Sequence, residues 1–288
     1  MSEYADQLAS SPFVASMTTR IDRHAAKYSE AVGQYFETPG GTRERDAEQH
    51  LLDDFNAHVE AVVAKYVPPG SRRQGDSLVF RHIYAAARKP DAEDEDARGV
   101  STEFLAALLA AEVEFRGPLR LSRTQRTLLA DVYERLGEFV ASAGLPAHAA
   151  LAFGRAGGLH RQNEDDDAED RCGLAKARAR TQAVQPPWHR IGRWISAVSC
   201  GYGYRPFRLL GWMGLQLVLF TTAITALTGR AFADAAYLCM TNYLNPAGLS
   251  EAKDLGAAAE ILLIIEAYAG IVSTSVFFAL LVRRWFRI

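Results

Sequence analysis

The amino-acid sequence predicts an all-α protein, with a helical cytoplasmic domain over residues 1–187 followed by a two-transmembrane-helix module with a re-entrant helix and loop. Apolar residues recur at helical spacing through the first part of the chain. Two long apolar runs lie between Leu209 and Val282, and they exclude a purely soluble protein. Charge is segregated as well. Residues 1–170 hold 19 Lys and Arg against 29 Asp and Glu, whereas residues 171–208 hold eight basic residues and no acidic one.

The composition is that of an average globular protein. The chain has 288 residues, a formal net charge of -2, 49% hydrophobic and 23% charged residues, which excludes wholesale disorder and a fibrous repeat. The opening MSEYADQLAS has no apolar core, so no secretory signal peptide is expected. Three cysteines have neither zinc-site spacing nor an even count, so we expect free thiols and neither a disulfide framework nor structural zinc: Cys172, Cys200 and Cys239.

The predicted cytoplasmic domain is mostly helical. Breaks rich in Gly, Pro or acidic residues separate the periodic stretches. The run SLVFRHIYAA at 77–86 fits a strand or a short helix equally well. Helical periodicity is found over Met17–Phe36, Arg43–Val67, Phe104–Phe115, Thr124–Ala143 and Ala147–Gln162.

One helical hairpin, over about residues 131–160, resembles the tetratricopeptide unit. In that unit, small residues at fixed offsets let two antiparallel helices pack closely. A further helix over Asp170–Ala183 could stack on the hairpin, and a generic helical hairpin is the alternative. The matching positions are Tyr133, Leu136, Gly137, Val140, Gly144, Ala149, Phe153 and Ala156.

The first transmembrane span is expected at residues 209–227, an uncharged stretch whose helical length matches a hydrocarbon layer of about 30 Å. The second is expected at 258–282, with Glu260 and Glu266 inside it. Eight basic residues precede the first span and three arginines follow the second, whereas the stretch 228–254 between the spans holds only Arg230 and Lys253. Both termini are therefore expected in the cytoplasm.

The segments beside the spans have their own predicted roles. Residues 188–208 form a basic interfacial segment that couples the domain to the membrane, because Arg205 precedes Pro206 and a helix should end there. Between the spans, Phe232–Leu244 is apolar but too short to cross the bilayer. A re-entrant segment over 232–248 is the preferred interpretation, and an amphipathic helix on the outer leaflet is the alternative.

These residues carry a family resemblance over about residues 188–288. The chain has CGYGYRPFRLLGW at Cys200–Trp212, a first span that ends Thr-rich, an aromatic re-entrant segment and E-x-x-x-G at Glu266–Gly270 before VRRWFR. It resembles the bacterial two-transmembrane pore-loop ion channels, in particular the channel module found after pentapeptide repeats. The resemblance implies a re-entrant pore helix and a homotetramer in the lipid bilayer of the cell inner membrane.

The filter motif of potassium channels, T-x-G-Y/F-G-D, is missing, so the resemblance does not imply potassium selectivity. The residues at the corresponding place are the filter candidates: Thr241, Asn242, Tyr243, Asn245, Pro246 and Gly248.

One face of the second span combines polar and aromatic residues at helical steps. Glu266 is interpreted as part of a carboxylate ring, as a brace behind the filter, or as a neutral hydrogen-bonded residue. The glycine on this face permits a bend or close packing, and the phenylalanine either gates the pore or faces lipid. The pore-lining or gate candidates are Glu266, Gly270, Ser273, Thr274 and Phe277.

Charged clusters in the cytoplasmic domain are weaker signals. A basic island could bind a phosphate-bearing ligand such as a nucleotide or oligonucleotide signal, or it could be exposed surface charge. The acidic run 164–170 lacks the pattern of a calcium loop and fits a solvated linker or a helix start. The ligand-binding candidates are Arg72, Arg73, Arg81 and Arg88.

No catalytic motif was found, so neither an enzyme nor a cofactor or metal site is expected; the seven histidines show no metal-binding spacing. The predicted function is an oligomeric ion channel gated by its cytoplasmic domain, which would sense a small molecule, an oligonucleotide or a partner protein. One alternative is an effector that depolarises the membrane in antiviral defence. The other is a non-conducting membrane-anchored adaptor.

Overall fold

The computed structural model describes residues 11–37, 47–68, 76–87, 100–183, 206–245 and 256–286. These ranges contain ten α-helices and no strand, as the all-α prediction requires. The chain divides into two compact units, Met1–Pro187 and Trp188–Ile288, and the boundary coincides with the end of the expected helical domain. Much of the predicted coupling segment 188–208 lies outside the described residues.

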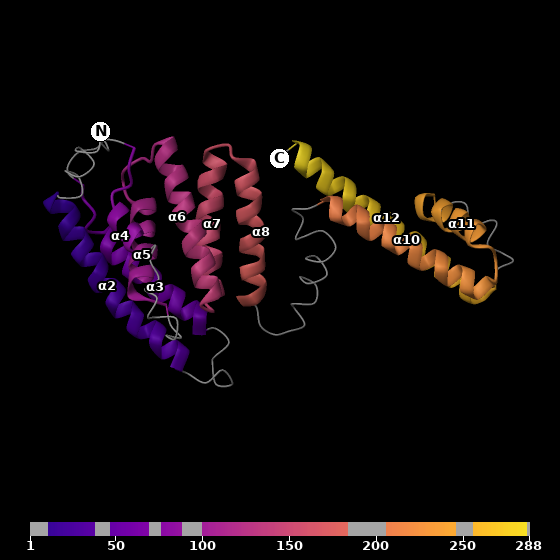
Figure 1. Ribbon diagram of the computed structural model, residues 1–288, viewed down its shortest axis with the longest axis horizontal. Coiled ribbons are helices and arrows are strands. Elements are labelled where there is room, and N and C mark those ends of the chain that lie inside the picture. The colour runs from indigo at the N-terminus through magenta and orange to yellow at the C-terminus, as the bar shows by residue number, and fades with distance from the viewer. Residues whose placement is uncertain are drawn as a thin grey trace. The chain divides into compact units, whose positions relative to one another are not determined.

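The first unit is a stack of helices (Figure 1). The ambiguous run at 77–86 contains a short helix, α4, and no strand. The last three helices lie side by side, with α7 packed against both α6 and α8. The helices are α2 (Pro12–Glu37), α3 (Ala47–Val63), α4 (Arg81–Ala86), α5 (Thr102–Arg116), α6 (Arg123–Ser142), α7 (Pro146–Gln162) and α8 (Asp166–Ala183).

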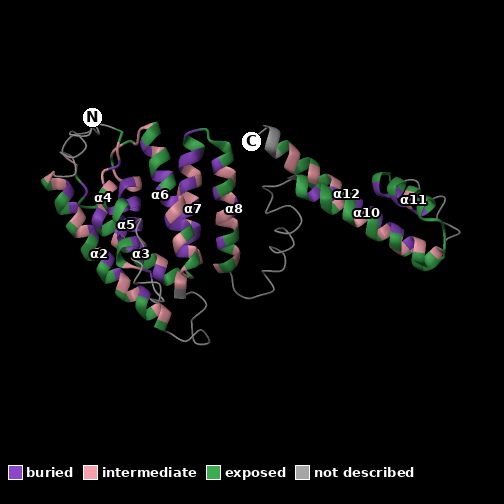
Figure 2. Cartoon of the chain, viewed as in Figure 1, coloured by how far each residue is buried: buried purple, intermediate pink, exposed green. Residues whose placement is uncertain are grey.

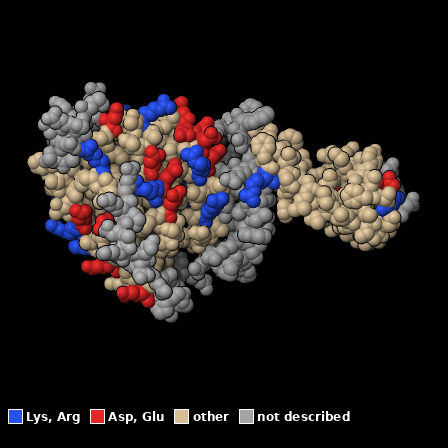
Figure 3. Space-filling view, in the orientation of Figure 1, with Lys and Arg blue, Asp and Glu red and all other residues tan. Residues whose placement is uncertain are grey.

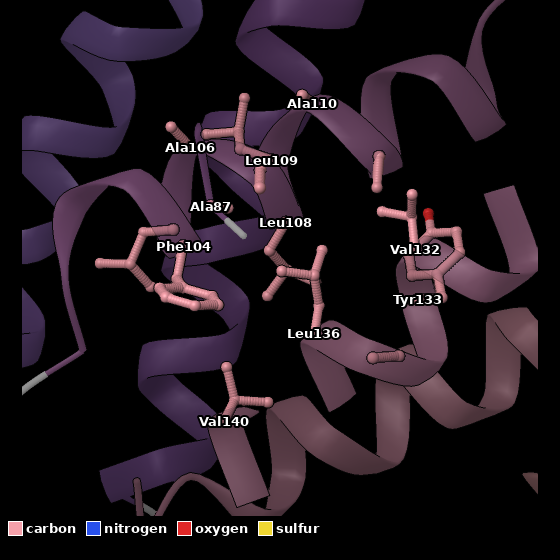
Figure 4. Packing of buried hydrophobic residues seen from close by; sticks show 14 of the residues in the cluster. Ala87, Phe104, Ala106, Leu108, Leu109, Ala110, Val132, Tyr133, Leu136 and Val140 are labelled. Carbon is pink, nitrogen blue, oxygen red and sulfur yellow. The ribbon is translucent and has the colours of Figure 1, made fainter. Parts of the chain in front are cut away.

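The core of this unit is centred on α5, whose apolar residues from Leu105 to Ala111 are all buried. Figure 2 shows buried residues concentrated in the inner helices, and Figure 4 shows Leu108 and Leu109 beside Leu136 of α6. Because α5 is surrounded, its sequence FLAALLAAEV is apolar on every face. Phe104 stacks on Phe139 with ring centroids 3.6 Å apart, which fastens α5 to α6.

The hairpin predicted at 131–160 is present as α6 and α7. A β-carbon at Gly137 would lie 3.0 Å from the Phe153 ring, so the glycine permits the close packing of these helices. Gly144 has φ +89° in the turn, a conformation that favours glycine, and Pro146 begins α7, as Pro does at many helix starts. The third helix of the stack, α8, begins at Asp166, so the acidic run is a helix start.

The second unit consists of α10 (Pro206–Thr228), α11 (Phe232–Leu244) and α12 (Ala257–Phe286). Within them, Phe207–Thr228 and Ala257–Val282 are long and apolar enough to cross a membrane, in agreement with the two predicted spans. Figure 3 shows few charged side chains on this unit, whereas the face of the first unit carries many. The large apolar residues that are exposed lie mostly here, as expected of helices whose solvent is lipid.

Candidate functional site

The short helix α11 packs along both long helices of the second unit (Figure 1). Its apolar face is buried with residues near the end of α10 and the beginning of α12. A 13-residue helix of this composition would be marginal alone, so these contacts hold it in place. The buried cluster consists of Ile224, Ala235, Leu238, Cys239, Ala259 and Leu263.

Asn242 connects α11 to α12 near its carboxyl end. Its Nδ2 donates a hydrogen bond to Glu266 Oε2 at 3.1 Å and another to the Leu263 carbonyl at 2.8 Å. Glu266 is completely buried and Asn242 nearly so. Because a charge-capable side chain is placed in an apolar helix contact only at considerable cost, this pair is a specific structural feature.

The next residue, Tyr243, connects α11 to α10. Its hydroxyl donates to Gln216 Oε1 at 3.0 Å, and Ser273 Oγ of α12 donates to the same oxygen at 3.1 Å. Gln216 lies twelve positions before Thr228, where α10 ends, and this is about 18 Å along the helix. The carboxyl end of α11 therefore lies beside the central turns of both long helices.

Gly270 makes the approach of α11 possible. A β-carbon at this position would lie 2.6 Å from the Tyr243 carbonyl oxygen and 3.1 Å from its ring. Real β-carbons do not approach that closely, so the position requires glycine or a shift of one helix. Of the two predicted roles for Gly270, the packing role agrees with this contact.

Five of the predicted site residues are thus brought together: Asn242, Tyr243, Glu266, Gly270 and Ser273. The last three are covered by α10 and α11 of the same chain, so their shared face packs inside the unit. The geometry of Glu266 corresponds to the brace, one of its three predicted roles.

The other predicted residues of this unit are not part of that cluster. The Thr241 hydroxyl donates to the carbonyls of Tyr237 and Leu238, both at 2.9 Å. Asn245 follows α11, and its N–H donates to the Thr241 carbonyl at 2.8 Å. Thr274 and Phe277 are half-buried on α12, whereas Pro246 and Gly248 lie outside the described residues.

The predicted basic island is represented only by Arg81, a half-buried residue at the start of α4. Arg72, Arg73 and Arg88 lie outside the described residues. The neighbouring His82 forms a hydrogen bond through Nε2 with the Thr18 hydroxyl at 2.9 Å.

The sequence did not reveal a histidine pair between α2 and α3. His24 Nδ1 and His58 Nδ1 lie 2.9 Å apart and share a hydrogen bond. Burial is the main cause that lowers the pKa of both rings; the partner imidazole and Lys27 lower that of His24 further. For His58, Asp54 acts in the opposite direction and Lys27 in the same one. The two histidines come from different helices, so no local spacing could have indicated the pair.

A buried ion network in the first unit was also missed. Glu112 is fully buried and accepts hydrogen bonds from Tyr133 Oη at 3.0 Å, Arg155 Nε at 2.8 Å and Arg116 Nε at 2.7 Å. Burial, followed by the Glu112 carboxylate, raises the pKa of Tyr133 well above its usual value. All of these groups are satisfied by one another, which is typical of a structural network.

No family model, curated protein or solved structure matches this chain. The fold and the site define a helical two-unit protein with two candidate membrane spans and a third helix fastened between them. Functional inference therefore rests on the contacts of α11.

Proposed function

We propose that the chain is one subunit of an oligomeric ion channel or pore of the inner membrane, gated from its cytoplasmic domain. The observation that carries the proposal is the position of Tyr243 beside Gln216 and Ser273. If α10 and α12 span the bilayer, α11 enters from the outer side and ends about halfway across. A helix lying flat on the outer leaflet would not make these contacts.

A chain segment that ends at this depth needs protein or water around its polar backbone. Non-helical backbone is tolerated in the hydrocarbon region only where it is buried in protein or lines an aqueous cavity. The residue that follows α11, Asn245, has non-helical dihedral angles, with φ -141° and ψ 87°. A re-entrant loop beside a water-filled passage meets this requirement.

Several copies are needed to enclose such a passage, because three helices of one chain surround no channel. The resemblance to pore-loop channels implies four copies with both termini in the cytoplasm. The outward face of α11 is apolar: Tyr237, Met240 and Leu244 are 70%, 54% and 67% exposed in the single chain. Lipid or neighbouring copies would cover this face.

The absent filter motif favours a poorly selective pore, and this observation supports the second candidate function. In that version the chain is a membrane-depolarising effector of antiviral defence, opened when the cytoplasmic domain receives its signal. Rapid loss of membrane potential and toxicity on expression would distinguish the effector from a regulated channel.

The test is ion flux through liposomes that contain the purified full chain, with potassium and sodium dyes as readouts. We expect flux from the wild type and a strong reduction in Asn242→Leu, which keeps the volume but removes both hydrogen bonds. Met240→Leu, an exposed change on the same helix, is the matched control and should conduct normally. A folded oligomer without flux, or normal flux in Asn242→Leu, would refute the proposal and leave the non-conducting adaptor.

A further inference from the structure

Three side chains able to bind a metal meet where α6, α7 and α8 pack together. His160 Nε2 lies 2.7 Å from Glu134 Oε1, and Cys172 Sγ lies 3.2 Å from the same oxygen. One ligand atom from each of the three residues lies within 4.8 Å of the other two. Each residue comes from a different helix, so the tertiary fold alone creates this cluster.

We propose that Glu134, His160 and Cys172 form a zinc-binding site. Zn²⁺ favours thiolate, imidazole and carboxylate ligands in tetrahedral geometry, with bonds of about 2.0–2.3 Å. Those bond lengths place ligand atoms about 3.4–3.6 Å apart. The two separations from Glu134 Oε1, 2.7 and 3.2 Å, therefore need to lengthen by less than about 1 Å to admit the ion.

The surroundings hold the ligands in place. His160 and Cys172 are 4% and 2% exposed, so packing restricts their rotamers. The Glu134 side chain is 29% exposed, which gives the ion a path from solvent. Asp131, one turn earlier on α6, interacts electrostatically with both Glu134 and His160. The fourth ligand is therefore water or the Asp131 carboxylate.

A second carboxylate orients the histidine. Asp165 Oδ2 lies 3.9 Å from His160 Nδ1, on the opposite side of the ring from Glu134. Metal-bound histidines almost always donate their other N–H to a carboxylate, carbonyl or water, and this partner sets the tautomer. Asp165 is itself held at the start of α8, where its Oδ1 accepts the Ala168 N–H at 3.1 Å.

Metal binding changes the proton positions in a defined way. Without the ion, the Cys172 thiol donates to Glu134, and His160 Nε2 donates to the same carboxylate oxygen. On binding, the thiol releases its proton to solvent and the sulfur becomes a thiolate ligand. The imidazole stays neutral, because its proton moves from Nε2 to Nδ1, facing Asp165. The bound ion would then join α8 to α6 and α7, beyond what apolar packing provides.

Cysteine spacing predicted no zinc site, since this cluster uses only one cysteine and its other two ligands lie on separate helices. The alternative is a hydrogen-bonded cluster that takes no metal, and binding measurements separate the two.

The experiment is a titration of the metal-stripped full chain, in detergent and with reductant, by Zn²⁺ against a chromophoric chelator. We expect one Zn²⁺ per chain. Cys172→Ser and His160→Gln should each lose more than about 10-fold in affinity, and Asp165→Asn should lose about 10-fold, as for other outer-shell partners. Glu138→Gln, one turn further along α6, and Cys239→Ser should bind as the wild type does.

A second readout does not depend on the variants folding. Co²⁺ bound to the wild type should give a thiolate-to-cobalt charge-transfer absorption band together with tetrahedral visible bands. Wild-type protein that binds no Zn²⁺ under these conditions, or Co²⁺ spectra without the thiolate band, would overturn the proposal. Equal zinc affinity of Cys172→Ser and the wild type would overturn it as well. None of these measurements depends on ion flux.

Discussion

Replacing Gly270 with alanine tests whether α11 reaches the middle of the membrane unit. The new β-carbon would lie 2.6 Å from the Tyr243 carbonyl oxygen, about 1 Å closer than ordinary non-bonded contact. Overpacking of this kind costs about 1–3 kcal/mol. The higher helix propensity of alanine offsets about 1 kcal/mol. The net effect is about 1–2 kcal/mol in favour of separating α11 from α12, which corresponds to roughly a 5- to 30-fold shift in the opening equilibrium.

The Cys239 thiol is a suitable reporter because it is fully buried and lies one turn before Tyr243. Maleimide labelling of the full chain in detergent, followed by peptide mass spectrometry, measures its reaction rate separately from those of the other cysteines. We expect labelling of Cys239 in Gly270→Ala to be roughly 5- to 30-fold faster than in the wild type, by the same equilibrium shift.

Gly214→Ala provides the matched control on α10. A β-carbon there has no heavy atom within 4 Å, so the substitution meets open space and should leave the labelling rate unchanged. If Gly270→Ala labels at the wild-type rate, the contact between Tyr243 and Gly270 does not exist in the protein. The argument for a re-entrant α11 would then lose its main support.

Three further predictions concern pH, the buried network and topology. Burial lowers the pKa of His24 and His58 in the folded state, so below about pH 6.5 the unfolded chain binds more protons. Stability should be constant above that pH and fall below it; circular dichroism melts at pH 7.5 and 5 measure this, and His58→Asn should reduce the acid sensitivity. Glu112→Gln should lower the free energy of unfolding by about 3 kcal/mol in urea titrations, at the low end for a broken buried ion pair because Arg155 is 28% exposed; a loss under about 1 kcal/mol would contradict the network. Arg230→Cys should react with a membrane-impermeant maleimide from outside intact cells, whereas protection from outside would reverse the expected orientation.

Helical periodicity predicted most of the fold because apolar faces are a local property of the sequence. The predicted stretches from Met17 to Gln162 became helices, with ends that differ by a few positions. The run at 77–86 was ambiguous because it is too short to contain three helical turns. Its folded form depends on Glu114 of α5, which accepts the Val79 N–H at 2.9 Å and the Tyr84 hydroxyl at 3.0 Å.

The candidate site was predictable in part, for the same physical reason. Glu266, Gly270 and Ser273 share a helical face, and the helical steps between them revealed that face. Which neighbour covers it depends on contacts between segments far apart in the chain, such as Asn242 with Glu266 and Gln216 with Ser273. The His24–His58 pair and the cluster around Glu134 were missed for this reason, since neither has a short-range pattern.

The hydrogen bonds of Gln216 link the two long helices to the end of α11 in a way that suits a switch. Tyr243 and Ser273 donate to the same oxygen, so a sliding movement of α10 relative to α12 breaks at least one of the two bonds. Such bonds in membrane proteins contribute about 0.6–1.7 kcal/mol each. Two states that differ by this amount are both populated, and a modest force on α10 can change their ratio. If the cytoplasmic domain moves α10, as the proposed channel requires, the carboxyl end of α11 responds directly, without any rearrangement of the apolar cluster around Cys239.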